Sequence, residues 1–203
     1  MSKRGEAPQV NAGSMADIAF LLLIFFLVTT SIETNVGLDR MLPPDAPTPP
    51  PTIAERNILP ILINGSDELM IDGDMVDLAE LRSITSSFLD NGGAAVGDDH
   101  YCGYCKGERD VNSSDNPHKA IVSLMSNRET SYGAYIAVQN ELVGAYNSLR
   151  NRESQRLFKT DFTALEAVYK NPKTSEAMKS EIKIKILKIQ ELYPMKLSEA
   201  ERN

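Results

Sequence analysis

The strongest hydrophobic pattern in the sequence is an apolar run near the start of the chain. Fifteen residues without a charge, IAFLLLIFFLVTTSI, lie between Asp17 and Glu33. An α-helix rises about 1.5 Å per residue, so this run covers only about 22 Å. A membrane span needs about 20 residues to cross about 30 Å of hydrocarbon. The pattern therefore predicts a single N-terminal transmembrane helix over residues 13–32, which includes the carboxylate of Asp17.

Short apolar runs further along the chain predict strands. Residues 58–63 and 69–73 are separated by the turn sequence NGSDE, which indicates two strands around a turn. Pro60 favours an edge position for the first of them, because proline cannot donate a hydrogen bond to a neighbouring strand. A third strand is expected at 120–125 and a short last strand around 195–197.

Apolar residues at helical spacing predict helices between and after these strands. Asp77, with Glu80 three residues later, forms a capping box ahead of one such stripe. A long helix is expected at about 132–158. Residues 175–193 alternate like a strand but also form a helical stripe, and the helix is favoured because Pro194 follows it.

The order of these elements predicts the domain organisation. Strands followed by amphipathic helices favour a small α+β domain with helices packed on one face of a mixed sheet. Six of the eleven prolines lie between Pro43 and Pro51, and such a run favours an extended polyproline II spacer. The expected parts are an N-terminal tail (1–12), the transmembrane helix (13–32), a Pro-rich tether (33–56) and an outer domain (57–203) with an insertion at about 91–119.

Composition and charge narrow the class of protein. The chain has 203 residues, of which 42% are hydrophobic and 24% are charged, and this excludes collagen-like, fully disordered and disulfide-framework proteins. Its net charge of -7 argues against nucleic-acid binding, which needs a clustered excess of Lys and Arg. The charge is unevenly spread: residues 67–115 hold 12 acidic and 3 basic residues, whereas residues 150–202 hold 12 basic and 8 acidic ones.

Two basic residues, Lys3 and Arg4, precede the apolar run and favour an orientation with the N-terminus inside. A cleaved signal peptide is an alternative, but the acidic residue at the head of the run and the lack of an A-x-A site argue against it. A further alternative places Asp17 at the membrane interface, where the positive end of the helix dipole suits a carboxylate.

Asp17 heads a stripe along one face of the predicted span. A carboxylate inside a membrane is costly and is usually present to bind or carry something. A single helix cannot shield it from lipid, so the pattern favours an oligomer or a polytopic partner. The polar and helix-face residues expected to support Asp17 are Asn11, Ser14, Leu21, Ile24, Val28, Thr29 and Thr30.

The sequence from Val10 to Val28, VNAGSMADIAFLLLIFFLV, resembles the ExbD/TolR family of energy-transducing inner-membrane proteins. The resemblance rests on an Asn six residues before the intramembrane Asp, on the apolar run after it, and on the Leu-Pro step at Leu42-Pro43 into a Pro-rich tether. The chain has Gly13-Ser14 where many members have Thr-Pro. The end of the chain, ELYPMKLSEAE, is similar to that of Bacteroidetes-type members.

The resemblance implies a proton-driven motor subunit in the bacterial inner membrane, with a cytoplasmic N-terminus and a periplasmic C-terminal domain. A pair of such helices, a homodimer, would lie inside a ring of ExbB/TolQ-type subunits and act on a TonB-like energy transducer. Asp17 would be the proton-carrying residue, since an apolar environment favours the neutral form of a carboxyl group and a polar path favours its ion. A TolR-like role in envelope integrity is the close alternative.

All cysteines and histidines of the chain lie in the predicted insertion, as His100, Cys102, Cys105 and His118. Four such ligands within 19 residues can form a tetrahedral zinc site. A disulfide between Cys102 and Cys105 is equally natural outside the inner membrane. A thioredoxin-like redox centre is disfavoured, because the Cys-x-x-Cys sequence does not follow a hydrophobic strand. The zinc and disulfide alternatives both remain open at this stage.

The sequence holds no nucleophile–base constellation, phosphate loop or dinucleotide fingerprint. We therefore expect no enzyme activity and no required cofactor, apart from the zinc considered above. The leading hypothesis is the proton-driven motor subunit. The alternative from another class is a membrane-anchored periplasmic thiol or zinc protein, in which the span is only an anchor.

Overall fold

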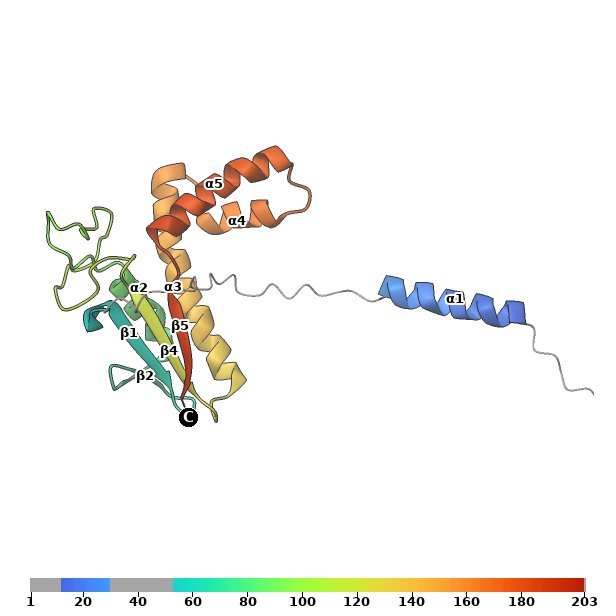
Figure 1. The fold of residues 1–203 in the computed structure, drawn as a ribbon, viewed down its shortest axis with the longest axis horizontal. Coiled ribbons are helices and arrows are strands. Elements are labelled where there is room, and N and C mark those ends of the chain that lie inside the picture. Colours follow the sequence, from blue (N-terminus) through green and yellow to red (C-terminus); the bar gives the residue numbers. More distant parts are fainter. Residues whose placement is uncertain (1–11, 30–52, 203) are drawn as a thin grey trace, which may run out of the picture. The chain divides into compact units, whose positions relative to one another are not determined.

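The computed structural model describes residues 12–29 and 53–202, which fall into two separate units. The first unit contains helix α1 (Ala12–Thr29). The second contains an α+β fold, and the two are described one at a time because their relative position is not determined (Figure 1). The predicted tail up to residue 11, the end of the predicted span from Thr30 and the tether up to residue 52 lie outside the described residues.

Helix α1 forms because its sequence, AGSMADIAFLLLIFFLVT, holds no proline and only one glycine, near its start. Asp17 is its only charged residue. In the part of the chain that the structure describes, no helix combines the length and the hydropathy that crossing a membrane requires.

Five strands of the second unit form one mixed sheet in the order β3-β2-β1-β4-β5. Their bounds are β1 Ile58–Ile63, β2 Leu69–Ile71, β3 Asp74–Val76, β4 Ile121–Asn127 and β5 Leu197–Arg202. β1 pairs antiparallel with β2 and parallel with β4, and β5 runs parallel to β4 at one edge. The predicted strands are therefore confirmed, although β3 was not expected and β5 begins two residues later and runs on to Arg202.

The edge position expected for β1 from Pro60 is wrong, because β1 lies between β2 and β4. The register explains how the proline is tolerated. β2 pairs with β1 only from Ile61 onwards. Pro60 is therefore paired with Ser123 of β4 but has no partner on β2. Locally the strand is an edge, where a missing N–H breaks no ladder.

The helices of the second unit are η1 (Glu55–Asn57), α2 (Leu78–Leu89), α3 (Tyr132–Phe158), α4 (Phe162–Lys170) and α5 (Glu176–Leu192). α2, α3 and α5 confirm the sequence prediction, and residues 176–192 are a helix and not a strand. The side chains of Asp77, Ser131 and Ser175 cap these three helices by accepting backbone N–H bonds. α4 was not predicted.

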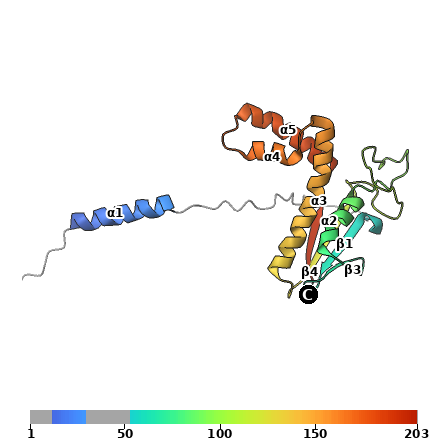
Figure 2. The same ribbon diagram turned by 180° about the vertical axis from the view of Figure 1, so that it is seen from behind.

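Helices α2 and α3 cover one face of the sheet, as Figure 2 shows from behind. Alternate residues of β1 and β4 are buried, so these strands turn one face to the helices. The largest fully buried side chains of this core include Ile61, Ile63, Leu81, Leu89, Leu124, Leu142, Tyr146 and Tyr193. The expected arrangement of helices packed on a mixed sheet is confirmed.

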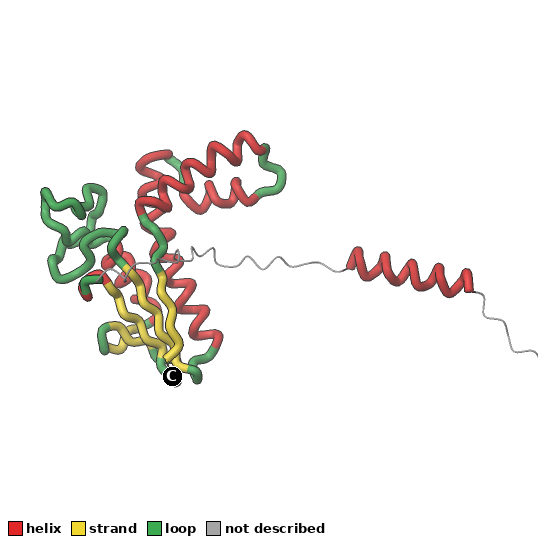
Figure 3. Tube along the Cα trace, in the orientation of Figure 1, coloured by secondary structure: helices red, strands yellow, loops and turns green. Residues whose placement is uncertain are grey.

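Helices α4 and α5 form a hairpin beyond the end of the sheet, with a core of its own (Figures 1 and 3). That core consists of Phe162, Leu165, Ile182, Ile186 and Ile189. Residues 91–119, the predicted insertion, contain no helix or strand and lie beside the start of β1, drawn as green tube in Figure 3.

Candidate functional site

Asp17 lies on the second turn of α1, and Leu21 and Ile24 follow it on the same face of the helix. All three residues are exposed within this unit. The remaining predicted support residues are only partly visible. Ser14, Val28 and Thr29 belong to α1 without a described side chain, and Asn11 and Thr30 lie outside the described residues. Asp17 is therefore the one charged group available on a helix whose other side chains are apolar or small.

Cys102 and Cys105 are joined in a disulfide. Both residues are buried, with 3% and 5% of their surface exposed. Arg109 fastens the loop from outside: its Nη2 donates to the carbonyl oxygens of Cys102 and Cys105 at 3.2 and 3.3 Å, and its guanidinium lies over the Tyr101 ring. The disulfide is thus an internal fastening of segment 91–119.

The two histidines do not join the sulfurs in a ligand set. His100 and His118 are both exposed, and the sulfurs are bonded to each other. Within residues 12–29 and 53–202, no group of three or more His, Cys, Asp or Glu side chains has the geometry to hold a metal ion. Of the two arrangements that the sequence leaves open, the structure has the disulfide.

Segment 91–119 is anchored to the point where β1 begins. Asp115 accepts hydrogen bonds from Asn57 Nδ2 and Arg56 Nε, both at 2.9 Å, and its backbone N–H donates to Asn57 Oδ1 at 2.8 Å. Burial raises the pKa of Asp115, but the hydrogen bonds from Asn57 and Arg56 outweigh it, so the pKa lies below its usual value. The carboxylate therefore acts as an ionised clamp.

Asn91 makes a second anchor just after α2. Its Nδ2 donates to the carbonyl oxygens of Asp110 and Ser114, each at 2.8 Å, and its Oδ1 accepts the N–H of Asp110 at 3.0 Å. Gly107 passes so close to Asn91 that a Cβ there would lie 2.6 Å from the Asn91 Cα atom. Only glycine fits this approach without a shift of the backbone.

An ionic network in which Asp90 is buried and Arg152 is half-buried joins α2, α3 and the end of α5. Arg152 donates from Nη1 and Nη2 to the two oxygens of Asp90 at 2.5 and 2.8 Å. The Tyr193 hydroxyl donates to Asp90 at 2.6 Å and accepts from Arg152 at 2.8 Å. Burial raises the pKa of Asp90, but the bonds from Arg152 and Tyr193 prevail and lower it below the usual value. Burial and the bond to Asp90 also raise the pKa of Tyr193 far above normal.

Arg150 extends this network to the hairpin. Its Nε and Nη2 donate to the Tyr193 carbonyl oxygen at 3.0 and 2.8 Å. Its guanidinium lies over the rings of Tyr146 and Phe162, one in the main core and one in the hairpin core. Arg150 therefore bridges the two cores, and Leu192 packs against both of them.

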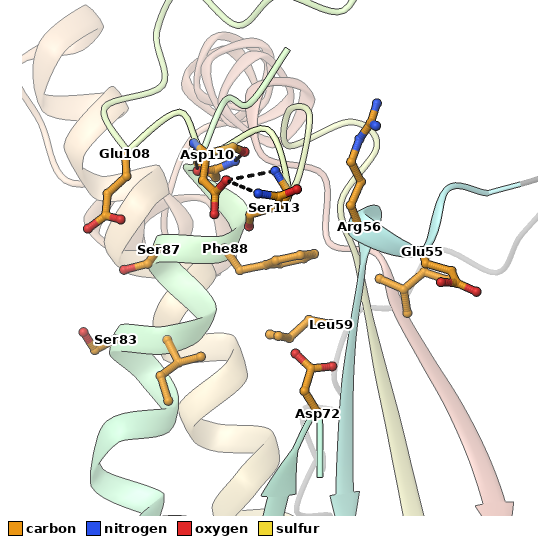
Figure 4. A pocket seen from close by; sticks show the side chains of 14 residues that line it. Glu55, Arg56, Leu59, Asp72, Ser83, Ser87, Phe88, Glu108, Asp110 and Ser113 are labelled. Carbon is orange, nitrogen blue, oxygen red and sulfur yellow. Dashed lines mark hydrogen bonds between the residues drawn. The ribbon is translucent and has the colours of Figure 1, made fainter. Parts of the chain in front are cut away.

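An open groove of about 630 Å³ lies between α2, the start of β1 and segment 91–119 (Figure 4). Leu59 and Phe88 contribute apolar surface, and Ser83 and Ser87 project from α2. The carboxylates that line it are Glu55, Asp72, Glu108 and Asp110. Since Arg56 is already paired with Asp115, the groove has a negative potential that favours cationic groups.

The disulfide supports a first prediction. Closing a loop of four residues stabilises a fold by about 2 kcal/mol in the chain-entropy estimate. We expect reductant to lower the free energy of unfolding of the full chain in detergent by about this amount. Urea unfolding with and without dithiothreitol measures it. A Cys102→Ser/Cys105→Ser variant, as the control, should not respond to reductant; an equal response of both proteins would contradict the structural role.

Thus an apolar helix with one carboxylate precedes a separate α+β unit in the chain. Residues 3–152 match the family described as Biopolymer transport protein ExbD/TolR. Because the match covers most of the chain, this protein belongs to the ExbD/TolR family. Over 89 residues it is 29% identical to the biopolymer transport protein exbD2 of Vibrio cholerae serotype O1. That alignment covers 43% of this chain and 63% of the relative, so less than two thirds of the relative is spanned.

Sequence reasoning missed the ionic network and the groove. Asp90, Arg152 and Tyr193 are far apart in the sequence, and each alone looks like an ordinary surface or core residue. The sequence does hold one signal for the network, which is the cluster of Arg150, Arg152 and Glu153 in a helix that must turn one side to the core. At least one of these charged residues must therefore lie on or near the buried side. Buried charges require partners, so such a cluster predicts an ion pair without naming its members.

Proposed function

We propose that this chain is the proton-carrying subunit of an inner-membrane complex of ExbB–ExbD–TonB type. Such a complex uses the proton motive force to energise outer-membrane transport. The observation that carries the proposal is Asp17, the only charged residue of α1, inside the segment that matches the family. An ionisable group on an otherwise apolar helix is by default a binding or proton-transfer site.

In this proposal α1 is part of a single membrane span with its N-terminus in the cytoplasm, and the α+β unit lies in the periplasm. The uninterrupted apolar sequence after Asp17 supports the span. Lys3 and Arg4, which precede the apolar run, support the orientation. A disulfide in the α+β unit supports an oxidising compartment for that unit.

The proposed energy source matches the chemistry of one carboxyl group. A charge that crosses the full membrane potential gains about 2.3 kcal/mol per 100 mV. Repeated protonation and release at Asp17 would let the helix move against a surrounding ExbB/TolQ-type ring. Shielding of the carboxylate from lipid favours a pair of copies inside that ring. A TonB-like transducer is the proposed partner of the periplasmic unit.

A TolR-like role in envelope integrity uses the same Asp17 chemistry and differs only in the partner. The family match is to ExbD/TolR as a whole, while the similar Vibrio protein is named as an exbD2, which favours the transport role. The thiol-protein alternative fits less well, because the disulfide is buried and held by Arg109.

Carbodiimide labelling tests the proposal. Dicyclohexylcarbodiimide reacts with protonated carboxyl groups in apolar surroundings, so we expect it to modify Asp17 in membranes that contain the full chain. The rate should fall as the pH is raised, because the reagent needs the protonated form. Mass spectrometry of the peptide that contains Asp17 measures the extent of labelling.

Glu33 is the control for this experiment, since it is the next carboxylate along the chain and lies at the polar exit of the proposed span. It should react slowly under the same conditions. Labelling of Asp17 that is no faster than labelling of Glu33 would refute an apolar, protonatable site.

A further inference from the structure

The outer face of α5 carries two large apolar side chains that no other described element covers. The inner face packs Ile182, Ile186 and Ile189 into the hairpin core. On the opposite side, Ile184 and Leu187 are 70% and 53% exposed. Single exposed apolar residues are normal, and these two neighbours form a small apolar patch on one helix face.

These two residues belong to a regular seam. Ala177, Ser180, Ile184, Leu187 and Glu191 follow one another at spacings of three and four residues and are all exposed. Spacings that alternate in this way place residues along one line of a helix. Two adjacent positions of this line, Ile184 and Leu187, are apolar, as in the contact line between two paired helices. The family match ends at residue 152, so this helix is a feature outside the matched segment.

The charges beside the seam select how a second helix can pair with it. Glu176 and Lys183 flank it on one side, and Glu181 and Lys188 flank it on the other. In a parallel pair, residues on one side of the seam face residues on the other side of the seam in the partner helix. This would place Glu176 of one copy against Glu181 of the other, and Lys183 against Lys188. In an antiparallel pair equal flanks meet, which places Glu181 against Lys188. Like charges therefore disfavour the parallel pair, and opposite charges favour the antiparallel one.

We propose that the outer face of α5 binds the same face of α5 in a second copy of this chain, with the two helices antiparallel. The two-fold axis crosses the helices at the height of the Lys185–Ile186 peptide bond. Ile184 of each copy packs on Leu187 of the other. Glu181 of each copy forms an ion pair with Lys188 of the other. The contact is isologous, so the same patch serves both copies and the assembly closes at two.

The existing contacts of α5 permit this pairing. Glu181 bonds Lys185 at 2.6 Å on the same helix, but both side chains are solvent-accessible and such pairs are weak and easily exchanged. Lys188 is exposed and projects from the outer side of the helix. Neither change requires the hairpin core to open.

The interface is small, because one helix of 17 residues supplies it. Contacts of this size bind weakly between free molecules. They become effective when two chains are held together elsewhere, because linkage raises the effective concentration. The proposed pairing rests on the pair of copies in the proposed function for this linkage. It uses none of the residues of the proton-carrying role, so the trapping experiment and the Asp17 experiments test the two separately.

A lipid surface is the other occupant that lysines beside apolar residues can suggest. Three carboxylates, those of Glu176, Glu181 and Glu191, lie on the same face of α5 and would repel anionic head groups. A second copy can form ion pairs with both the carboxylates and the lysines of this face, whereas an anionic membrane attracts only the lysines. The second copy is therefore the favoured occupant.

Disulfide trapping of the full chain in detergent tests the pairing. The two-fold axis places Ser180 of one copy beside Glu191 of the other, so a Ser180→Cys/Glu191→Cys variant should form covalent dimers under mild oxidation. The two positions are 11 residues apart on one helix, about 16 Å, and cannot be bridged within a chain. The Ser180→Cys single variant is the register control and should give little dimer.

Charge substitutions added to the Ser180→Cys/Glu191→Cys variant then distinguish a specific contact from disulfides formed by random collision. Lys188→Glu reverses two symmetry-related pairs and should lower the trapped dimer about tenfold. Adding Glu181→Lys to the same chain should restore it. Mixing the Lys188→Glu and Glu181→Lys variants should produce the heterodimer in preference to either homodimer.

Restoration by the charge swap establishes the antiparallel contact. Equal trapping in the Ser180→Cys control, no effect of Lys188→Glu, or no recovery in the swapped chain each overturns it. Absence of trapping together with protection of Lys183 and Lys188 from amine reagents by phosphatidylglycerol vesicles would overturn it in favour of a lipid surface.

Discussion

An Asp17→Asn variant should lose energised transport completely, down to the level of a strain without this chain. The substitution keeps the size and polarity of the side chain but removes its ability to take up and release a proton. Asp17 is the only charged residue of α1, so no other group on this helix can replace it. Uptake of an outer-membrane substrate in a complemented deletion strain measures the effect, and immunoblotting of membranes should show an unchanged amount of protein.

The matched control is Asp17→Glu, which keeps a titratable carboxyl group and should retain part of the activity. Full activity of Asp17→Asn would refute the motor role. If, in addition, Cys102→Ser abolished activity, the thiol-protein alternative would be supported in its place. The two substitutions lie in separate units of the chain, so their effects can be read independently.

The largest expected effect on stability follows from Arg152→Ala. Asp90 has only 8% of its side chain exposed, and removal of Arg152 leaves its carboxylate without a cation. Removing one partner of a buried ion pair costs about 3–5 kcal/mol, because the remaining charge is desolvated and uncompensated. Arg152 is 28% exposed and Asp90 keeps the hydrogen bond from Tyr193, so urea unfolding of the full chain should show a loss near the lower end of this range.

Arg82→Ala is the matched control. Arg82 pairs with Glu141, so this ion pair also joins α2 to α3, but Arg82 is 51% exposed. Exposed pairs contribute about 0–1 kcal/mol. An Arg152→Ala loss no larger than the Arg82→Ala loss would show that the buried network is not what stabilises this junction. An Asp90→Ala/Arg152→Ala double variant should be more stable than the sum of the two single losses implies.

The same network predicts how stability depends on pH. The pKa of Asp90 lies below its usual value of 3.8 in the folded chain. Its contribution is therefore fully present above 3.8 and is lost as the pH falls below that value toward the folded pKa. The stability advantage of the unchanged chain over Asp90→Asn should shrink in that range and stay constant near neutral pH.

Elements with regular hydrophobic periodicity could be predicted from the sequence. α3 was expected at its observed bounds, and the stripe through Ile182, Ile186 and Ile189 outweighed the strand-like alternation of the same segment. β3 and α4 were missed because each is short. β3 is held by its register with β2 and not by an apolar pattern of its own, and α4 has only nine residues.

Contacts between distant residues could not be predicted. The Asp115 clamp depends on Arg56 and Asn57, almost 60 positions earlier, and the groove depends on the same juxtaposition. For Cys102 and Cys105, spacing allowed both metal and disulfide, and only the folded loop, with the histidines pointing to solvent, places the sulfurs together. The prediction for Asp17 rests on a different signal, the energetic cost of a charge in an apolar helix.

The position of β1 has a mechanical consequence. It is the first described strand after the predicted tether, and it pairs with β4 along its whole length and with β2 from Ile61 onwards. A tensile load that enters along this strand acts on its ladders with β2 and β4 in shear, so many hydrogen bonds resist together and do not open one by one. The Asp115 clamp on Arg56 and Asn57 sits ahead of this strand and would take up the load first. An edge strand in that place would have only one ladder to resist the same force.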